Sequence, residues 1–233
     1  MNSNNEYTAV VAGATGLIGE ELIKLLLDDV NCKAVLALTR RELPYSEKRF
    51  IQCIHPRLEL CSEHLPVLSQ APMFGFIALG TTIKQAGSKQ ALEAIDYQLV
   101  CDVAQQMKNL GTERLAVVSS LGAKATSMSH YLKCKGRMEQ SLINMDFTHL
   151  CIVRPGPLTG LREHPRHDEM LTASVLKVIK PLLKGQLRNL RLIHGKTVAQ
   201  AMHIEIHAQG EQQILYSRDM EQLVRMTDPR PSR

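Results

Sequence analysis

The 233-residue sequence contains no tryptophan, and aromatic residues make up only 4% of it. The interior must therefore be built from aliphatic side chains. The sequence also lacks any C-x-x-C pair, because its six cysteines stand apart at positions 32, 53, 61, 101, 134 and 151. This scatter argues against a disulfide framework and against a cysteine zinc site, so we expect reduced and mostly buried thiols.

Long apolar runs are missing as well. The first apolar segment, residues 8–12, is short and has no basic flank, so it does not resemble a signal peptide. The helical pattern at residues 17–27 carries Glu20, Glu21 and Lys24 and cannot span a bilayer. We therefore expect a cytoplasmic protein with no membrane partner.

The net charge of +5 is unevenly distributed. Residues 154–196 hold nine Lys or Arg and three Asp or Glu, a balance of +6, and the rest of the chain sums to −1. This segment is either a solvated helical face or a field that attracts an anionic substrate or partner. Its cations have no interleaved aromatics and form no dense run, so no nucleic-acid partner is expected.

Short aliphatic runs alternate with longer helical patterns along the chain. The predicted strands lie at residues 7–12, 34–39, 74–79, 114–119, 149–154 and 190–193, with the third strand of the sheet at either 51–54 or 58–61. The predicted helices lie at residues 17–28, 89–109, 130–144, 169–183 and 197–207. Such alternation indicates a parallel sheet with right-handed crossovers. We predict an α/β protein with a Rossmann-type doubly wound sheet in the order 3-2-1-4-5-6.

Residues 10–19, Val-Val-Ala-Gly-Ala-Thr-Gly-Leu-Ile-Gly, form a glycine turn between the first strand and the first helix. The strand pattern stops at Gly13, and Gly16 and Gly19 follow at intervals of three. Glycines here let the pyrophosphate of a dinucleotide approach the backbone, where amides of the helix N-terminus face its negative charge. The strand–turn–helix context predicts a dinucleotide-binding fold.

The end of the second strand indicates which dinucleotide binds. Sites selective for NAD place an acidic residue roughly 20 residues beyond the glycine turn, whereas this sequence has Arg40 and Arg41 there. A guanidinium can hold a 2′-phosphate through two hydrogen bonds. We therefore favour NADP(H) as the cofactor. The alternative is that both arginines are surface charges at the end of a strand.

Tyr131 and Lys135 are four residues apart and share one face of a predicted helix. A nearby ammonium favours the phenolate and lowers the pKa of the phenol, which makes this pair a candidate general acid/base for carbonyl reduction or alcohol oxidation. Ser120, at the end of the preceding strand, can hydrogen-bond the substrate oxygen. The alternative is that Ser119 and Ser120 only cap the strand and Tyr131 packs on the surface.

Together, the glycine turn, residues 119–123 and the Tyr131-x-x-x-Lys135 pair resemble an atypical short-chain dehydrogenase/reductase. Residues 79–88 and 152–156 resemble the branch of the Tat-interacting protein oxidoreductase and its bacterial NAD(P)H-binding relatives. The resemblance implies that Lys135 also contacts the nicotinamide ribose. With the glycines and arginines above, the expected cofactor-binding residues are Gly13, Thr15, Gly16, Leu17, Ile18, Gly19, Arg40, Arg41, Leu79, Gly80, Thr81, Thr82, Tyr131, Lys135 and Pro155.

One departure from that family concerns the adenine. Many relatives carry an Asp soon after the third strand, whereas residues 60–63 read Leu-Cys-Ser-Glu. We expect residues 1–226 to form a single NAD(P)-binding Rossmann domain, with residues 157–190 as a small lid or substrate region and residues 227–233 as a disordered tail. The helix at 89–109 can pair with a symmetry mate to form a homodimer.

No metal site is predicted, because the pairs His203/His207 and His164/His167 show no third ligand by spacing. Two functions fit the remaining residues. One is an NADPH-dependent oxidoreductase acting on a small carbonyl or alcohol compound. The other is a redox-sensing regulator that binds NADPH and engages a protein partner without turnover. The Tyr131/Lys135 pair favours the enzyme, since a sensor has no need of it.

Overall fold

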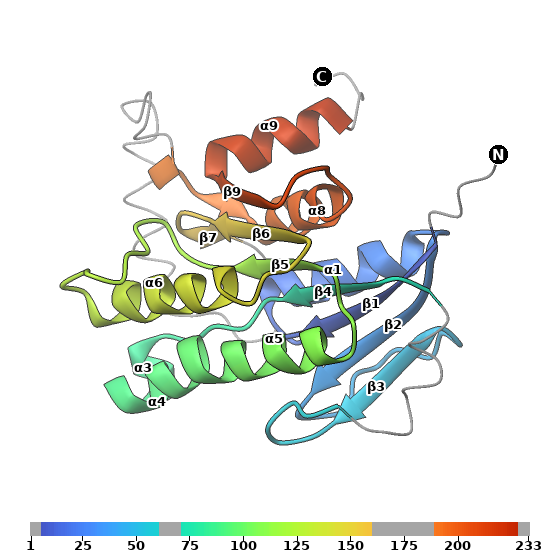
Figure 1. The fold of residues 1–233 in the computed structure, drawn as a ribbon, viewed down its shortest axis with the longest axis horizontal. Helices are drawn as coiled ribbons and strands as arrows, with labels where there is room; N and C mark the ends of the chain where they lie inside the picture. The colour runs from blue at the N-terminus through green and yellow to red at the C-terminus, as the bar shows by residue number, and fades with distance from the viewer. Residues whose placement is uncertain (1–5, 61–70, 160–188, 228–233) are drawn as a thin grey trace.

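A parallel sheet runs through the middle of the molecule in the computed structural model, which describes residues 6–60, 71–159 and 189–227 (Figure 1). Within these residues it has seven strands in the order β3-β2-β1-β4-β5-β6-β9, and each neighbouring pair is parallel. The strands are β1 (Tyr7–Ala12), β2 (Cys32–Thr39), β3 (Phe50–Ile54), β4 (Met73–Ile77), β5 (Arg114–Val118), β6 (His149–Arg154) and β9 (Gln212–Tyr216). The predicted Rossmann-type sheet and its order are confirmed, with a seventh strand at one edge.

Helices cover both faces of this sheet (Figure 1). One face carries α1 (Leu17–Asp28), α8 (Gly195–Glu205) and α9 (Ser217–Thr227); the other carries α3 (Ile83–Ala86), α4 (Lys89–Glu93), α5 (Val100–Asn109) and α6 (His130–Ile143). Successive strand residues point to opposite faces. In β1, Ala9 and Val11 therefore pack against α1 and α8, while Val10 and Ala12 pack against α5 and α6. This two-sided burial explains why the central strands are apolar throughout.

Two predictions about strands are wrong. The run at 190–193 does not join the main sheet: β8 (Ile193–His194) pairs only with β7 (Leu158–Thr159) in a separate two-stranded sheet. The edge position is taken by β9, which the sequence did not indicate because its first residues are polar and exposed. An edge strand is covered less completely than a central one, so its apolar pattern is weaker. The third strand is β3, the first of the two candidates.

The long helix expected at 89–109 is one continuous helical segment, but it is not α-helical throughout. Residues Ala94–Leu99 form a π-helical turn between α4 and α5. A π-turn widens the helix locally and is frequent at functional sites. Here it carries the buried Asp96. The predicted helix at 169–183 and most of the predicted lid lie outside the described residues.

Cys53 is disulfide-bonded, so the expectation of reduced cysteines is wrong at this position. The free cysteines among the described residues are Cys32, Cys101, Cys134 and Cys151. Residues 228–233 of the expected disordered tail lie outside the described residues, but Thr227 itself is helical and ends α9.

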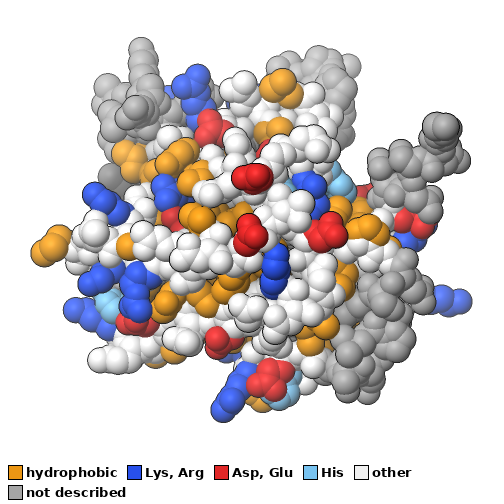
Figure 2. Space-filling model, viewed as in Figure 1, with side chains coloured by type: hydrophobic (Ala, Val, Ile, Leu, Met, Phe, Trp, Pro, Cys, Tyr) orange, Lys and Arg blue, Asp and Glu red, His pale blue; other side chains and the backbone are white. Residues whose placement is uncertain are grey.

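The described surface gives no sign of a membrane-crossing helix. None of the helices in the described ranges has the length and apolar content that a bilayer crossing requires. Figure 2 shows acidic and basic side chains interspersed over the face that carries α4, α5 and α6.

Candidate active site

The glycine turn lies directly after β1, and two of its three glycines are required by the fold itself. Gly13 has a φ of +90°, and a Cβ there would lie 2.6 Å from the carbonyl oxygen of Ala78. A Cβ at Gly19 would overlap the carbonyl group of Gly13. These two glycines therefore allow α1 and the end of β4 to pack closely on the turn.

Gly16 differs from the other two glycines. No protein atom lies closer than 3.4 Å to the position that its Cβ would occupy, so the fold does not exclude a side chain there. Gly16 is the N-cap of α1 and provides no side-chain hydrogen bond to the first-turn amides. These amides have no partner within the helix. An N-cap without a side chain leaves the first-turn amides accessible to a dinucleotide phosphate, so the residues present fit this cofactor.

The other predicted residues of the turn offer mainly backbone groups. Leu17 and Ile18 are buried in the core, whereas Thr15 is exposed. The amide groups of Leu17 and Ile18, rather than their side chains, are therefore available to a ligand at this end of α1.

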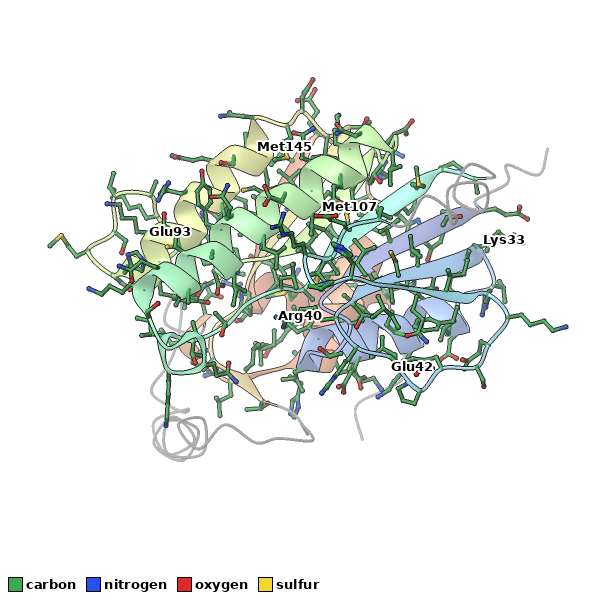
Figure 3. All side chains as sticks on the ribbon, turned by 90° about the horizontal axis from the view of Figure 1, so that it is seen from below. Lys33, Arg40, Glu42, Glu93, Met107 and Met145 are labelled. Atoms are coloured by element: carbon green, nitrogen blue, oxygen red, sulfur yellow. The ribbon has the colours of Figure 1, made fainter. Side chains whose placement is uncertain are left out.

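Arg40 and Arg41 follow β2, the immediate neighbour of β1, and both are exposed. The Thr39 hydroxyl fixes their backbone: it donates to the Arg41 carbonyl oxygen at 2.7 Å and accepts from the Arg41 amide at 3.3 Å. Figure 3 shows Arg40 and Lys33 at opposite ends of β2. Within the part of the chain that the structure describes, no carboxylate forms an ion pair with either arginine.

The segment of Leu79 to Thr82 follows β4, on the other side of β1. The Thr82 side chain caps the N-terminus of α3 by accepting from the Gln85 amide. The Thr81 amide donates to Asp96 Oδ2 at 2.8 Å. This loop is therefore fixed to the π-helical turn, and it covers the polar groups beneath it.

The most buried polar pair of the site is Lys135 with Asp96. Lys135 Nζ lies 2.9 Å from Asp96 Oδ1, and the two side chains are 2% and 0% exposed. The Leu79 and Val118 carbonyl oxygens lie 3.4 and 3.3 Å from the same ammonium. The Oδ1 contact is an ion pair without hydrogen-bond alignment, since no aligned donor reaches Oδ1 among the described residues.

Burial by itself lowers the pKa of Lys135, but the charges of Asp96 and Tyr131 more than offset it, so the pKa lies above its ordinary value. The side chain is therefore an ammonium at neutral pH. The role of Asp96 was not predicted from the sequence. The sequence pattern that could have indicated this role is a single acidic residue on an otherwise apolar face of the predicted helix.

Tyr131 is the second residue of α6, one turn before Lys135, and is half-buried. Tyr131 contributes, after Asp96, to the raised pKa of Lys135. The two residues lie in the same helix, four residues apart. A contact between Lys135 and the nicotinamide ribose would require an accessible ammonium. Here the Lys135 side chain is only 2% exposed and lies beneath Gly80.

The two serines after β5 have different environments. Ser119 is buried and donates to Glu139, which also accepts from Arg154 Nε at 2.9 Å. Ser119 is therefore committed to a structural network. Ser120 is half-buried, and its hydroxyl has only a long 3.5 Å contact with the Leu121 carbonyl oxygen among the described residues. Its hydroxyl can reorient toward a ligand.

Gly136 explains how the serine loop and α6 come together. A Cβ at Gly136 would overlap the backbone of Lys124 and Ala125, so α6 lies in direct backbone contact with the loop that follows Ser120. The Lys124 amide also donates to the Leu132 carbonyl oxygen at 3.1 Å. The loop that carries Ser120 and the helix that carries Tyr131 are thus one packed unit.

The loops after β1, β2, β4, β5 and β6 meet at the carboxyl edge of the sheet, where ligands of doubly wound proteins bind. Pro155, after β6, is buried, and its carbonyl oxygen accepts from the Leu121 amide at 3.0 Å. Of the segment near the expected adenine position, only Leu60 is described, and its amide donates to the Gln106 side chain.

Comparisons with known proteins identify relatives in fungi. Residues 46–185 match the HIM1 family. The chain is 36% identical over 159 residues to "Protein FMP52, mitochondrial" of Saccharomyces cerevisiae, covering 68% of this chain and 69% of that protein. It is 32% identical over 177 residues to the protein of the same name from Candida albicans, covering 75% and 76%.

These relatives are named as mitochondrial proteins, which contradicts the expectation of a cytoplasmic protein. A missing signal peptide does not by itself specify a compartment. The matches do not confirm the expected place in the Tat-interacting branch.

Solved structures share the fold at low sequence identity. WbmG of Bordetella bronchiseptica, in complex with NAD, has a TM-score of 0.66 at 12% identity, covering 99% of this chain and 81% of that chain. The PhqB reductase domain of Penicillium fellutanum has a TM-score of 0.63 at 20% identity, covering 92% and 68%. The chain thus shares its Rossmann-type fold with these proteins.

Proposed function

This chain belongs to the HIM1 family, and we propose that it is an NADP(H)-dependent oxidoreductase that acts on a small carbonyl or alcohol substrate. The observation that carries the proposal is the Tyr131 phenol placed one helical turn from an ammonium that Asp96 keeps charged. A buried, permanently charged neighbour is what a phenol needs to exchange a proton near neutral pH. The bare N-cap at Gly16 supplies the adjoining phosphate site.

Each residue has a separate task in this proposal. The nicotinamide, when bound, supplies or accepts the hydride. Tyr131 transfers the proton to or from the substrate oxygen. Lys135 places its positive charge one helical turn from the phenol, and Ser120 orients the oxygen by a hydrogen bond. A contact between Lys135 and a ribose hydroxyl requires the loop of residues 79–82 to shift, because this loop covers the ammonium.

The preference for NADP(H) is supported by Arg40 and Arg41, two exposed guanidinium groups beside the glycine turn that have no acidic partner in the described part of the chain. Structural neighbours such as WbmG bind NAD, so the preference needs its own test. Thermal shifts should be larger with NADPH than with NADH. In the Arg40→Ser, Arg41→Ser double variant the affinity for NADPH should fall by about tenfold, or roughly 1.4 kcal/mol, while the affinity for NADH stays the same. An unchanged or reversed preference would remove the arginines from the site.

The proton-transfer role is tested by Tyr131→Phe. Turnover with a panel of carbonyl compounds, followed by NADPH absorbance, should fall by about 100-fold or more, whereas NADPH affinity should change little. The matched control is Tyr45→Phe, since Tyr45 packs on Phe50 away from the carboxyl edge of the sheet. Turnover of Tyr131→Phe at the rate of the control would show that another group moves the proton.

The second candidate function is an NADPH-binding regulator that does not turn over. It is favoured by one observation: the Lys135 ammonium is closed off beneath the loop of residues 79–82. This function is supported if the wild-type protein binds NADPH tightly but turns over no carbonyl compound, and if Tyr131→Phe behaves in the same way.

The motif Leu79-Gly80-Thr81-Thr82 supports placing the chain near the Tat-interacting branch.

A further inference from the structure

A second polar cluster lies at the opposite end of β1 from the glycine turn. It combines Asp29, at the end of α1, with His203 and His207 from the last part of α8 and the residues that follow it. Tyr7, the first residue of β1, lies against this cluster. The strand itself, from residue 7 to residue 13, separates it from the dinucleotide crevice by about 20 Å.

The potential ligand atoms of the cluster are close together. One atom from each of Asp29, His203 and His207 lies within 4.8 Å of the other two. His203 Nε2 is 3.1 Å from Asp29 Oδ2, and the two imidazole rings are 5.8 Å apart between centroids. Zinc bound at about 2.0–2.1 Å holds its tetrahedral ligands roughly 3.4 Å from one another. Small side-chain rotations are therefore enough to converge on one ion.

We propose that Asp29, His203 and His207 bind a divalent transition-metal ion of the zinc class. Two imidazole nitrogens and one carboxylate oxygen form a donor set that zinc uses in proteins. His203 lies in α8 and His207 in the turn that follows it, with the two ring centroids 5.8 Å apart. His207 is exposed, so a water molecule can take the fourth position. The function of the ion would be to fasten α8 to α1 and β1.

The surroundings of the cluster favour the protonation states that a metal requires. Burial by itself raises the pKa of Asp29, but hydrogen bonds from the Asn31 amide and the Tyr7 hydroxyl lower it below its ordinary value. The Tyr7 and Phe74 rings pack against the His207 ring, and this partial desolvation lowers the pKa of His207.

Tyr7 would support the site without binding the metal. Its hydroxyl donates to Asp29 Oδ2 at 2.7 Å, and burial raises the pKa of the phenol, so it remains a donor. A ligand carboxylate is often fixed by such an outer hydrogen bond. The nearby Cys32 thiol is not a ligand of this set, since it faces the Ala34 carbonyl oxygen and burial raises its pKa to about 11.

One cation opposes the proposed ion. Arg114, on β5, disfavours positive charge at His207. Its guanidinium is directed to backbone acceptors, however, with Nε donating to the Ile206 carbonyl oxygen at 2.5 Å. It also lies over the Phe74 ring. Its effect is to reduce the affinity rather than to occupy the site.

A second group of metal-ligand types, Glu93 with His130 and Cys134, provides an internal control. There the carboxylate already forms an ion pair with Arg137 at 2.5 Å. His130 Nε2 lies 3.1 Å from the Lys89 carbonyl oxygen. With its carboxylate neutralised by a guanidinium, this group is not expected to hold a metal.

The proposal is tested by titrating the chelator-treated 233-residue protein with Co²⁺ and following visible d–d absorption, then competing with Zn²⁺. The wild-type protein should take up one equivalent. His207→Gln and His203→Gln should each weaken binding by about 100-fold, and Tyr7→Phe by about tenfold. His130→Gln is the matched control and should bind as tightly as the wild type.

Three results would overturn the proposal: no stoichiometric uptake by the wild type, full uptake by His207→Gln, or loss of uptake in His130→Gln. Circular dichroism of each apo variant checks that it is folded. Should His203→Gln fail to fold, His207→Gln decides the matter, because His207 is exposed and lies outside α8.

Discussion

The two ends of β1 differ in the groups that they offer to a ligand: backbone amides at the carboxyl end and side chains at the amino end. At the carboxyl end three glycines lack side chains: Gly13 and Gly19 permit close backbone packing, and Gly16 leaves the first-turn amides of α1 uncovered. At the amino end, side chains converge, with Tyr7 and Asp29 joined to His203. The carboxyl end is suited to a large anion that meets backbone donors, and the amino end to a small cation that meets side-chain ligands.

The difference shows where an ionisable group can be accommodated in this fold. The buried charge near the carboxyl end, Lys135, is matched by a fully buried carboxylate, Asp96. At the amino end, Asp29 and His203 keep partial contact with solvent. A fully buried ion pair depends strongly on both partners, whereas a pair that keeps some contact with water is less sensitive to the loss of one.

The largest expected effect follows from removing one partner of the buried pair. Asp96→Ala leaves the Lys135 ammonium buried without a carboxylate, and it should cost about 3–5 kcal/mol of unfolding free energy. Asp29→Ala, measured with chelator present, should cost only about 1–3 kcal/mol, because it removes hydrogen bonds to Tyr7 and His203 that are partly replaced by water. Urea denaturation at pH 7 measures both.

One result would contradict the predicted difference in stability. Equal losses in the two variants would mean that the two ends of β1 do not differ in their dependence on a buried charge. Asp96→Asn serves as the control, since it keeps an acceptor for the Thr81 amide while removing the charge.

A smaller effect is expected from blocking the phosphate path without disturbing the fold. Gly16→Val adds a Cβ that would lie 3.4 Å from the Gly13 carbonyl oxygen, an ordinary contact distance, so the midpoint of urea unfolding should change little. NADPH affinity should fall by about 100-fold, because the side chain covers the first-turn amides. Isothermal titration calorimetry gives the affinity.

The opposite outcome for Gly16→Val is also informative. Unchanged NADPH affinity would show that the cofactor does not approach the backbone at this turn. Leu190→Val is a suitable control, since Leu190 is an exposed aliphatic residue outside the turn.

The smallest expected effect concerns the independence of the two ends. Sites about 20 Å apart with no shared partners are usually additive. Saturating the protein with Zn²⁺ should therefore raise its thermal midpoint but change NADPH affinity by less than about twofold. A larger change, measured by calorimetry with and without chelator, would reveal coupling along β1 and α1.

Prediction from sequence succeeded where the signal is local. The glycine turn, the strand–helix alternation and the four-residue spacing of Tyr131 and Lys135 each depend on residues close together in the chain. This periodicity located five strands of the main sheet and left the third between two candidates, and together with the glycine turn it predicted their order. The edge strand β9 escaped notice because only its last residues are apolar and covered.

The sequence by itself determined a Rossmann-type fold, a dinucleotide turn and a phenol one turn from an amine, because helix and strand periods are written in neighbouring residues. Only the tertiary structure decided which basic side chain each buried or half-buried acid contacts. Asp96 reaches Lys135 through a π-helical turn, and Asp29 reaches His203 across 174 residues of chain. Such encounters depend on how helices pack on the sheet, and no local pattern records them.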